Sequence, residues 1–211
     1  MHPSRLLTEE IPIHLPTVDQ DVVLRPMRDT PNDRDRARRA YAGLDSASRM
    51  NRFWSNNASL SEAMVDRLLQ ADQYNHVVWA ALPSDSSDLP GIGAASYWRD
   101  PKDERTAEFS ITVAPAFRRA GIGTMLLALL WSIARFHGID SFVGHVRPEN
   151  RAAIRWLSGL EGDHRFAAGE VLIHWPLKSV DELEEGGNNN PLKRQIAHWQ
   201  RILNPKLFTA R

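Results

Sequence analysis

A strand, a glycine turn and a long apolar helix follow one another between residues 105 and 137. Polar and apolar side chains alternate over residues 105–113, which predicts a strand with one buried face. Apolar residues recur at three- and four-residue intervals over residues 121–137, which predicts a core helix. Gly121 and Gly123 lie in the turn, where glycine lets a ligand approach the backbone closely. Because helix starts carry unpaired N–H groups and partial positive charge, this junction predicts a pyrophosphate site.

The spacing around the turn excludes two well-known phosphate-binding motifs. A P-loop needs Lys followed by Ser or Thr after its last glycine, whereas Gly123 is followed by Thr124 and Met125. A dinucleotide fingerprint needs a third glycine at the position that Leu126 occupies. The anion site must therefore belong to another class.

The pattern that remains is Arg118-x-x-Gly121-x-Gly123 between a strand and a helix. It resembles the acetyl-CoA signature of the GNAT N-acetyltransferases. The resemblance implies that acetyl-CoA is the co-substrate and that the turn surrounds its pyrophosphate with seven residues: Arg118, Arg119, Ala120, Gly121, Ile122, Gly123 and Thr124. The alternative is an ordinary connection with glycines in the turn and solvated arginines.

The order of the expected elements also matches that family. We expect strands at residues 22–25, 75–82, 91–98, 105–113, 141–146 and 170–177, and helices at 32–41, from about 59, 121–137 and 150–160. The predicted class is α/β (α+β). The resemblance implies a GNAT fold with a central, mixed and mostly antiparallel sheet, splayed central strands and flanking helices.

Composition divides the chain into four segments. We expect an N-terminal extension over residues 1–20, an acetyltransferase domain over 21–177, a polar linker over 178–190 and a C-terminal helix with a tail over 191–211. One face of that helix is apolar, with Leu192, Ile196, Trp199 and Leu203. It therefore packs on its own domain or on a second copy in a homodimer.

Three further segments resemble a narrower group, the Pat-type protein-lysine acetyltransferases. Residues 44–53 contain a Ser-x-x-x-Arg-Phe segment, residues 107–108 read Ala-Glu, and residues 149–152 read Glu-Asn-Arg-Ala. The resemblance implies that Glu108 is the catalytic glutamate and that Asn150 contacts the pantetheine arm. An N-cap of the following helix is a second reading for Asn150, compatible with the first.

The proposed chemistry needs a base. A lysine of pKa about 10.4 is neutral in only about one molecule in two thousand at pH 7, and general-base help is worth about a hundred- to ten-thousand-fold. Strand parity sets Glu108 on the face opposite the core-facing Phe109. The resemblance also implies that backbone groups of Ile111 and Val113 pair with the pantetheine amides. The alternative for Glu108 is a surface glutamate or the partner of a nearby arginine.

The sequence offers several candidates for the group that protonates the leaving thiolate. Many GNAT enzymes carry a tyrosine seven residues after the asparagine, where this chain has Leu157. Tyr97 and Tyr74 are candidates, as is solvent, and a thiolate of pKa near 8.5 can also leave unprotonated. His145 is a candidate second base or acceptor contact, or a histidine satisfied within its strand.

Composition limits the partners. Acidic and basic residues balance at 26 each, so no global field recruits nucleic acid or an anionic membrane. The absence of cysteine excludes an acyl-cysteine step, and the histidines show no metal-ligand spacing. No apolar run reaches the ~18 residues of a membrane span, and residues 1–20 lack a secretory apolar segment, so we expect a cytoplasmic protein.

Together these features predict an acetyl-CoA-dependent N-acetyltransferase. We expect direct transfer to an amine, with a protein lysine as the acceptor and Glu108 as the base. A small-molecule amine is the alternative acceptor. A non-catalytic acyl-CoA-sensing module is the alternative function, in which the basic helix carrying Arg34, Arg36, Arg38 and Arg39, or the C-terminal helix, contacts a partner.

Overall fold

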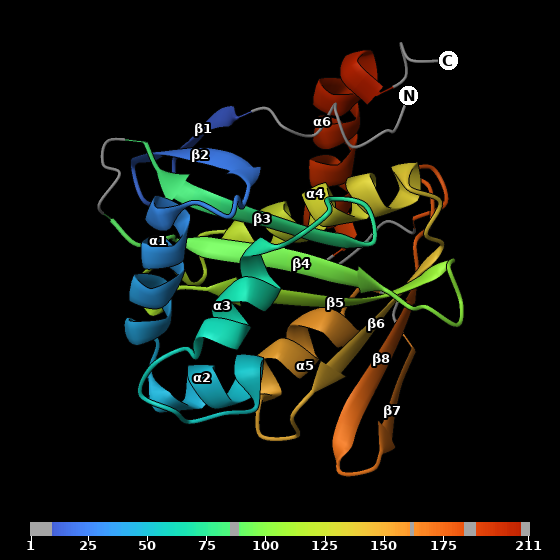
Figure 1. The fold of residues 1–211 in the computed structure, drawn as a ribbon. Coiled ribbons are helices and arrows are strands. Elements are labelled where there is room, and N and C mark those ends of the chain that lie inside the picture. The colour runs from blue at the N-terminus through green and yellow to red at the C-terminus, as the bar shows by residue number, and fades with distance from the viewer. Residues whose placement is uncertain (1–9, 85–88, 161–162, 184–188, 208–211) are drawn as a thin grey trace. The chain divides into compact units, whose positions relative to one another are not determined.

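The computed structural model describes residues 10–84, 89–160, 163–183 and 189–207. Its eight strands form one sheet in the order β1-β2-β3-β4-β5-β6-β8-β7 (Figure 1). The strands are β1 (Ile11–Leu15), β2 (Gln20–Pro26), β3 (His76–Pro83), β4 (Gly93–Arg99), β5 (Thr106–Val113), β6 (Ser141–Val146), β7 (Asp163–Ala167) and β8 (Glu170–Pro176). Because β5 and β6 are parallel and the pairs β1–β2, β2–β3, β6–β8 and β7–β8 are antiparallel, the predicted mixed sheet is confirmed.

The described residues also form six α-helices and one 3₁₀ turn, all but the last helix lying between strands in the sequence. They are α1 (Pro31–Ala42), α2 (Ser46–Phe53), α3 (Glu62–Leu69), η2 (Pro115–Phe117), α4 (Ile122–Phe136), α5 (Arg151–Ser158) and α6 (Asn189–Leu207). The chain divides into two compact units. The first unit is Met1–Ser96 with Ile111–Leu126, and the second is Tyr97–Ser110 with Leu127–Arg211.

In the first unit, α1, α2 and α3 gather over β3 and the start of β4 (Figure 1). Each of these helices begins at a capping side chain: Thr30, Asp45 and Ser61 accept hydrogen bonds from the N–H groups of Asp33, Ser48 and Met64. The helix α3 contributes Val65 and Leu69 to a core with Met27, Val78, Ala80 and Leu82. The capping residues thus fix where three short helices start above the sheet.

Two arginines of α1, Arg34 and Arg38, form ion pairs. Arg34 donates to Asp29 and Asp66 at 2.6 Å each, and Arg38 reaches Glu62 at 2.8 Å. Below them, Arg25 binds the buried carboxylate of Asp33 through two hydrogen bonds of 2.8 and 2.5 Å. The arginine-rich helix is therefore part of a mixed-charge network rather than a purely basic surface.

The second unit has a core of stacked rings. Phe109 stacks on Phe142 with ring centroids 5.4 Å apart, and Trp175 lies 5.9 Å from Phe109 and 5.7 Å from Trp131. The helix α6 buries Leu192, Ile196, Trp199 and Leu203 to 4% exposure or less. The apolar face predicted for this helix is therefore covered by its own chain, without a second copy.

Besides the 3₁₀ turn η2, two strands and one helix were not predicted: β1, β7 and α2. The first lies within residues 1–20, which we expected to be an extension, and pairs with β2 from Ile11↔Leu24 to Leu15↔Gln20. The helix α2 and the edge strand β7 are polar and short, so they carry little apolar periodicity. The expected linker over 178–190 lies partly outside the described residues. Among those residues, none of the helices combines the length and apolarity of a membrane span.

Candidate active site

The glycine turn adopts left-handed backbone at two positions. Gly121 has φ 81° and Arg119 has φ 67°, and the helix α4 begins at Ile122 with the first bond from Met125 N–H to the Gly121 carbonyl at 3.0 Å. Apart from Gly121 and the backbone next to it in the chain, no atom of the described residues lies within 4 Å of the place where a Cβ of Gly121 would stand. The backbone conformation, rather than crowding, explains why glycine occupies this position.

The guanidinium of Arg118 is held by helix α2. It donates to Ser48 Oγ at 2.6 Å and to the Val113 carbonyl at 3.3 Å, and Asp45 lies 3.9 Å away. Ser48 in turn donates its hydroxyl and its N–H to Asp45, which lowers the pKa of that carboxyl. Arg118 is therefore not a simply solvated turn residue. Arg118 and Arg119 are both exposed, so these hydrogen bonds hold Arg118 while it stays open to solvent.

The strand β5 carries Glu108 on its exposed face. Its neighbours Ala107 and Phe109 are 0% and 7% exposed, whereas Glu108 is exposed, which confirms the predicted alternation. The described pairing of β5 with β6 covers Thr106↔Ser141, Ala107↔Phe142 and Glu108↔Val143, although β5 continues to Val113. Pairing with β6 thus ends, in the described residues, at Glu108.

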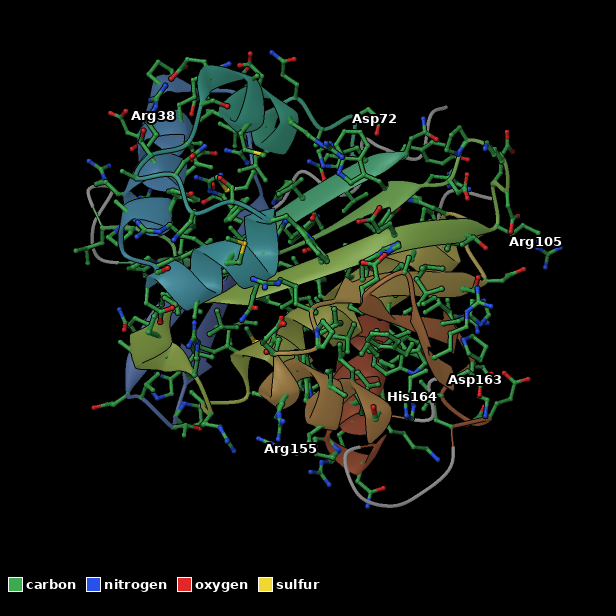
Figure 2. All side chains as sticks on the ribbon, turned by 90° about the horizontal axis from the view of Figure 1, so that it is seen from below. Arg38, Asp72, Arg105, Arg155, Asp163 and His164 are labelled. Atoms are coloured by element: carbon green, nitrogen blue, oxygen red, sulfur yellow. The ribbon has the colours of Figure 1, made fainter. Side chains whose placement is uncertain are left out.

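The sheet register extends the face of Glu108 across the second unit. Val143 pairs with Glu108, His174 pairs with Val143, and Asp163 pairs with His174, so these four residues form one cross-strand row. Glu108, His174 and Asp163 are exposed, and Asp163 points outward from β7 (Figure 2). His145 is two residues further along β6, and its Nδ1 lies 3.1 Å from Glu170 Oε1. The face is open and polar.

An exposed tryptophan on this face was missed by the sequence reasoning. The Asp100 N–H donates to the Thr106 carbonyl at 2.9 Å, so Asp100 and Thr106 lie opposite each other at the end of β4 and the start of β5. In an antiparallel pair, two residues further along each strand Trp98 then lies opposite Glu108. Trp98 is 39% exposed. In the sequence it reads only as an ordinary aromatic in a strand, since nothing local distinguishes an exposed tryptophan from a buried one.

The other predicted site residues have mixed outcomes. Asn150 caps α5, because its Oδ1 accepts from the Ala153 N–H at 3.2 Å.

Tyr97 is fully buried, with its hydroxyl 2.6 Å from His137 Nδ1, so it does not reach the exposed face. Within the described residues, no group of three His, Cys, Asp or Glu side chains is placed to hold a metal ion.

A buried histidine lies in the first unit. His76 is 4% exposed at the start of β3, and burial lowers its pKa to about 4, against the opposing effect of Asp72. Asp72 accepts hydrogen bonds from the N–H groups of Tyr74, Asn75 and His76. This histidine is therefore neutral near pH 7 and belongs to the structural framework.

Residues 49–160, more than half of the chain, match the Acetyltransferase (GNAT) family. The chain belongs to this family. The matched residues include both the glycine turn and Glu108. The protein is therefore a GNAT acetyltransferase, and acetyl-CoA is its acetyl donor.

The chain is similar to two acetyltransferases in sequence and to one crystal structure in fold. An acetyltransferase of Pseudomonas aeruginosa is 28% identical over 62% of this chain and 69% of its own length. The acetyltransferase Pat of Mycolicibacterium smegmatis is 27% identical over 61% of this chain but only 37% of its own length. The GNAT domain of S. lividans PAT has a TM-score of 0.71 at 22% identity, covering 83% of this chain and 99% of that domain.

The residues of the turn suit the acetyl donor. The start of α4 presents backbone N–H groups, Gly121 leaves the space beside it open, and the exposed Arg119 supplies positive charge. Each of these properties favours the binding of a pyrophosphate.

Proposed function

We propose that this GNAT acetyltransferase transfers acetyl directly from acetyl-CoA to the side-chain amine of a protein lysine, with Glu108 as the general base. The observation that carries the proposal is the position of Glu108 on the exposed, polar sheet face of the second unit. A flat, open face admits a lysine presented by a protein surface, whereas a metabolite is usually enclosed. Likeness to Pat supports the same acceptor class.

We assign the remaining residues to the donor. Arg118, Arg119, Ala120, Gly121, Ile122, Gly123 and Thr124 would surround the pyrophosphate, as the turn geometry favours. The backbone groups of Ile111 and Val113 would pair with the pantetheine amides, because they lie beyond the point at which the described pairing of β5 with β6 ends. Asn150 would contact the same arm while capping α5.

The proposed reaction removes two protons from the lysine nitrogen, because an ammonium group with three N–H bonds becomes an amide with one. Glu108 accepts a proton from the lysine ammonium, and the neutral amine forms a bond to the acetyl carbonyl carbon. As the carbon–sulfur bond breaks, coenzyme A leaves as a thiolate and the nitrogen releases its second proton to solvent, which can protonate the thiolate. Tyr97 is buried and Leu157 has no proton to give. No covalent acetyl-enzyme is needed in a chain without cysteine.

The experiment uses labelled acetyl-CoA and a cell extract divided into protein and small-molecule fractions. We expect label on protein lysines with the wild-type enzyme and a loss of about a hundred- to ten-thousand-fold in rate with Glu108→Gln, at unchanged acetyl-CoA affinity. Glu104→Gln is the matched control, because Glu104 is an exposed glutamate in the turn that precedes β5.

Other results would contradict the proposal in distinct ways. Label only among small molecules would assign a metabolite amine as the acceptor. Label in neither fraction, with acetyl-CoA still bound, would favour an acyl-CoA sensor. Full activity of Glu108→Gln on protein would overturn its role as the base.

A further inference from the structure

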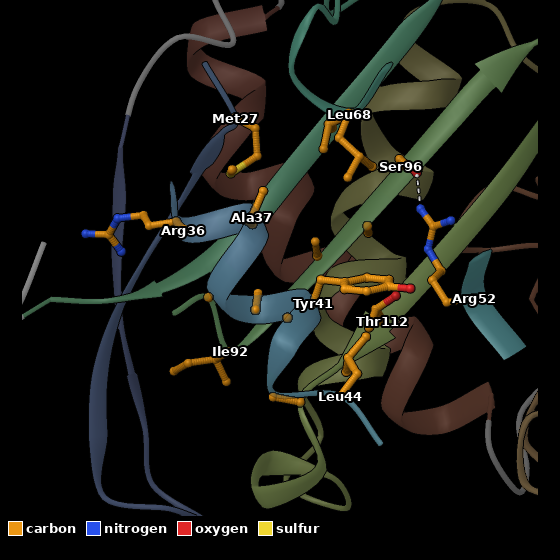
Figure 3. Close-up of a pocket in the computed structure, with 18 of the residues that line it drawn as sticks. Met27, Arg36, Ala37, Tyr41, Leu44, Arg52, Leu68, Ile92, Ser96 and Thr112 are labelled. Atoms are coloured by element: carbon orange, nitrogen blue, oxygen red, sulfur yellow. Dashed lines mark hydrogen bonds between the residues drawn. The ribbon is translucent and has the colours of Figure 1, made fainter. Parts of the chain in front are cut away.

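A cavity of about 100 Å³ lies inside the first unit (Figure 3). On the sheet side, β3 contributes Val78, Ala80 and Leu82, and β4 contributes the small residues Gly93, Ala94, Ala95 and Ser96. Helix α1 contributes Ala37 and Tyr41, and α3 contributes Leu68. The cavity exists because alanines and glycines stand where larger core side chains would otherwise close the gap.

One hydroxyl in this cavity has no hydrogen-bond partner among the described residues. Tyr41 donates to the Asn57 carbonyl at 2.8 Å, and Ser96 accepts from Arg52 at 3.4 Å (Figure 3). Thr112 Oγ1 is buried and has no hydrogen-bond partner in the part of the chain that the structure describes. Because buried polar groups in native proteins are nearly always hydrogen-bonded, a ligand oxygen is the natural missing partner.

The lining disfavours an amine. It contains no Asp, Glu or His, and its two charged residues are Arg36 and Arg52, which repel an ammonium group. Arg52 lies over the ring of Phe53, 5.0 Å from its centroid. An apolar chain that carries one oxygen therefore suits the cavity, and an acceptor lysine does not.

The cavity lies beside the strand segment that we assign to the pantetheine arm. Thr112 is the residue between Ile111 and Val113, and all three belong to the first unit together with the whole lining of the cavity. Alternation along β5 points the side chain of Thr112 into the cavity while its neighbours point to the other face. A donor bound along this segment has its acyl group within reach of the cavity.

We infer that this cavity binds the acyl chain of acyl-CoA donors longer than acetyl. The occupant is a short aliphatic acyl group of about three to six carbons, whose thioester oxygen lies at the Thr112 end. The inference rests on the proposed placement of the donor along Ile111 and Val113. It does not depend on the acceptor or on Glu108.

Titration calorimetry with acetyl-CoA, butyryl-CoA and hexanoyl-CoA tests the inference without any acceptor. For the wild-type protein we expect butyryl-CoA to bind about tenfold more tightly than acetyl-CoA, because two more methylenes are buried. Ala37→Leu should abolish this preference while leaving acetyl-CoA affinity unchanged. Ala42→Leu is the matched control, since Ala42 lies on the same helix, is exposed and does not line the cavity.

A second filling variant, Ala94→Leu, reaches the cavity from the sheet side and should also remove the preference. Equal affinity for acetyl-CoA and butyryl-CoA in the wild-type protein would overturn the inference, and so would a preference that survives both filling variants. A protein that prefers butyryl-CoA yet transfers no acyl group would keep the cavity assignment and contradict only the proposed function.

Discussion

The two units of this acetyltransferase are built on opposite packing strategies. In the second unit, the rings of Phe109, Phe142, Trp175 and Trp131 contact one another and fill the core. In the first unit, alanines and glycines line a cavity of about 100 Å³ under α1. A tightly filled core resists change, whereas a core of small residues leaves room for a ligand. The proposed base, Glu108, is thus carried by the tightly packed second unit, and the proposed acyl group binds in the loosely packed first unit.

The largest effect is expected from emptying the filled core. Phe142 is 0% exposed and stacks on Phe109, so Phe142→Ala should lower the free energy of unfolding by about 3–5 kcal/mol. Urea denaturation gives this quantity. A loss below about 1 kcal/mol would show that the second unit is more loosely packed than its ring contacts indicate.

The buried histidine of the first unit predicts a pH effect of up to about 3 kcal/mol. The pKa of His76 is about 4 in the folded state, against the ordinary value of 6.5. Above pH 6.5 both states are neutral and the effect vanishes. As pH falls below 6.5, the unfolded state binds the proton first, so stability decreases until about pH 4, where the loss is complete.

Urea denaturation at several pH values between 7.5 and 4 measures this effect. His76→Gln should reduce the loss of stability over that range relative to the wild-type protein, while the carboxylate contributions common to both proteins cancel. Identical pH profiles would mean that His76 takes up its proton in the folded state as readily as in the unfolded chain.

Adding one methyl group to a glycine in each unit tests the difference in packing most directly. A Cβ at Gly144 would stand 2.7 Å from the ring of Phe109, so Gly144→Ala should destabilise the second unit by about 1–3 kcal/mol. Gly91 is the matched position in the first unit, where a Cβ would meet Leu82 at an ordinary 3.4 Å. Thermal denaturation should show a clear loss for Gly144→Ala and little for Gly91→Ala. Equal losses would contradict the comparison.

The smallest expected effect is a gain in the stability of the folded protein. Thr112→Val removes a buried hydroxyl without a partner among the described residues and keeps the side-chain shape, so it should stabilise the ligand-free protein by about 1 kcal/mol. The midpoint of thermal unfolding is the measurement. A decrease would show that this hydroxyl already has a partner in solution, such as an ordered water molecule.

Sequence periodicity predicted those features of the site that depend on local strand or helix structure. The exposed position of Glu108 followed from strand alternation, and the apolar helix after the glycines followed from its periodicity. The hydrogen bond from Arg118 to Ser48 joins residues 70 positions apart, and no local pattern reports such a contact.

The cavity was unpredictable for the same reason. Its lining comes from helices and strands scattered between Met27 and Ala114, and each residue alone reads as an ordinary core alanine, leucine or glycine. The helix α2 was missed because polar residues dominate it, yet its capping residue Asp45 and its Ser48 hold the turn arginine. Tertiary contacts gave these residues their roles.

The left-handed backbone at Arg119 has a consequence for laboratory evolution of this enzyme. At φ 67° the backbone conformation of an arginine is less stable than that of an asparagine, which tolerates the left-handed region well. Selection for heat resistance would therefore favour Arg119→Asn. The same exchange removes the exposed guanidinium from the turn. Libraries screened only for thermostability would therefore drift toward proteins that fold better and hold their donor less well.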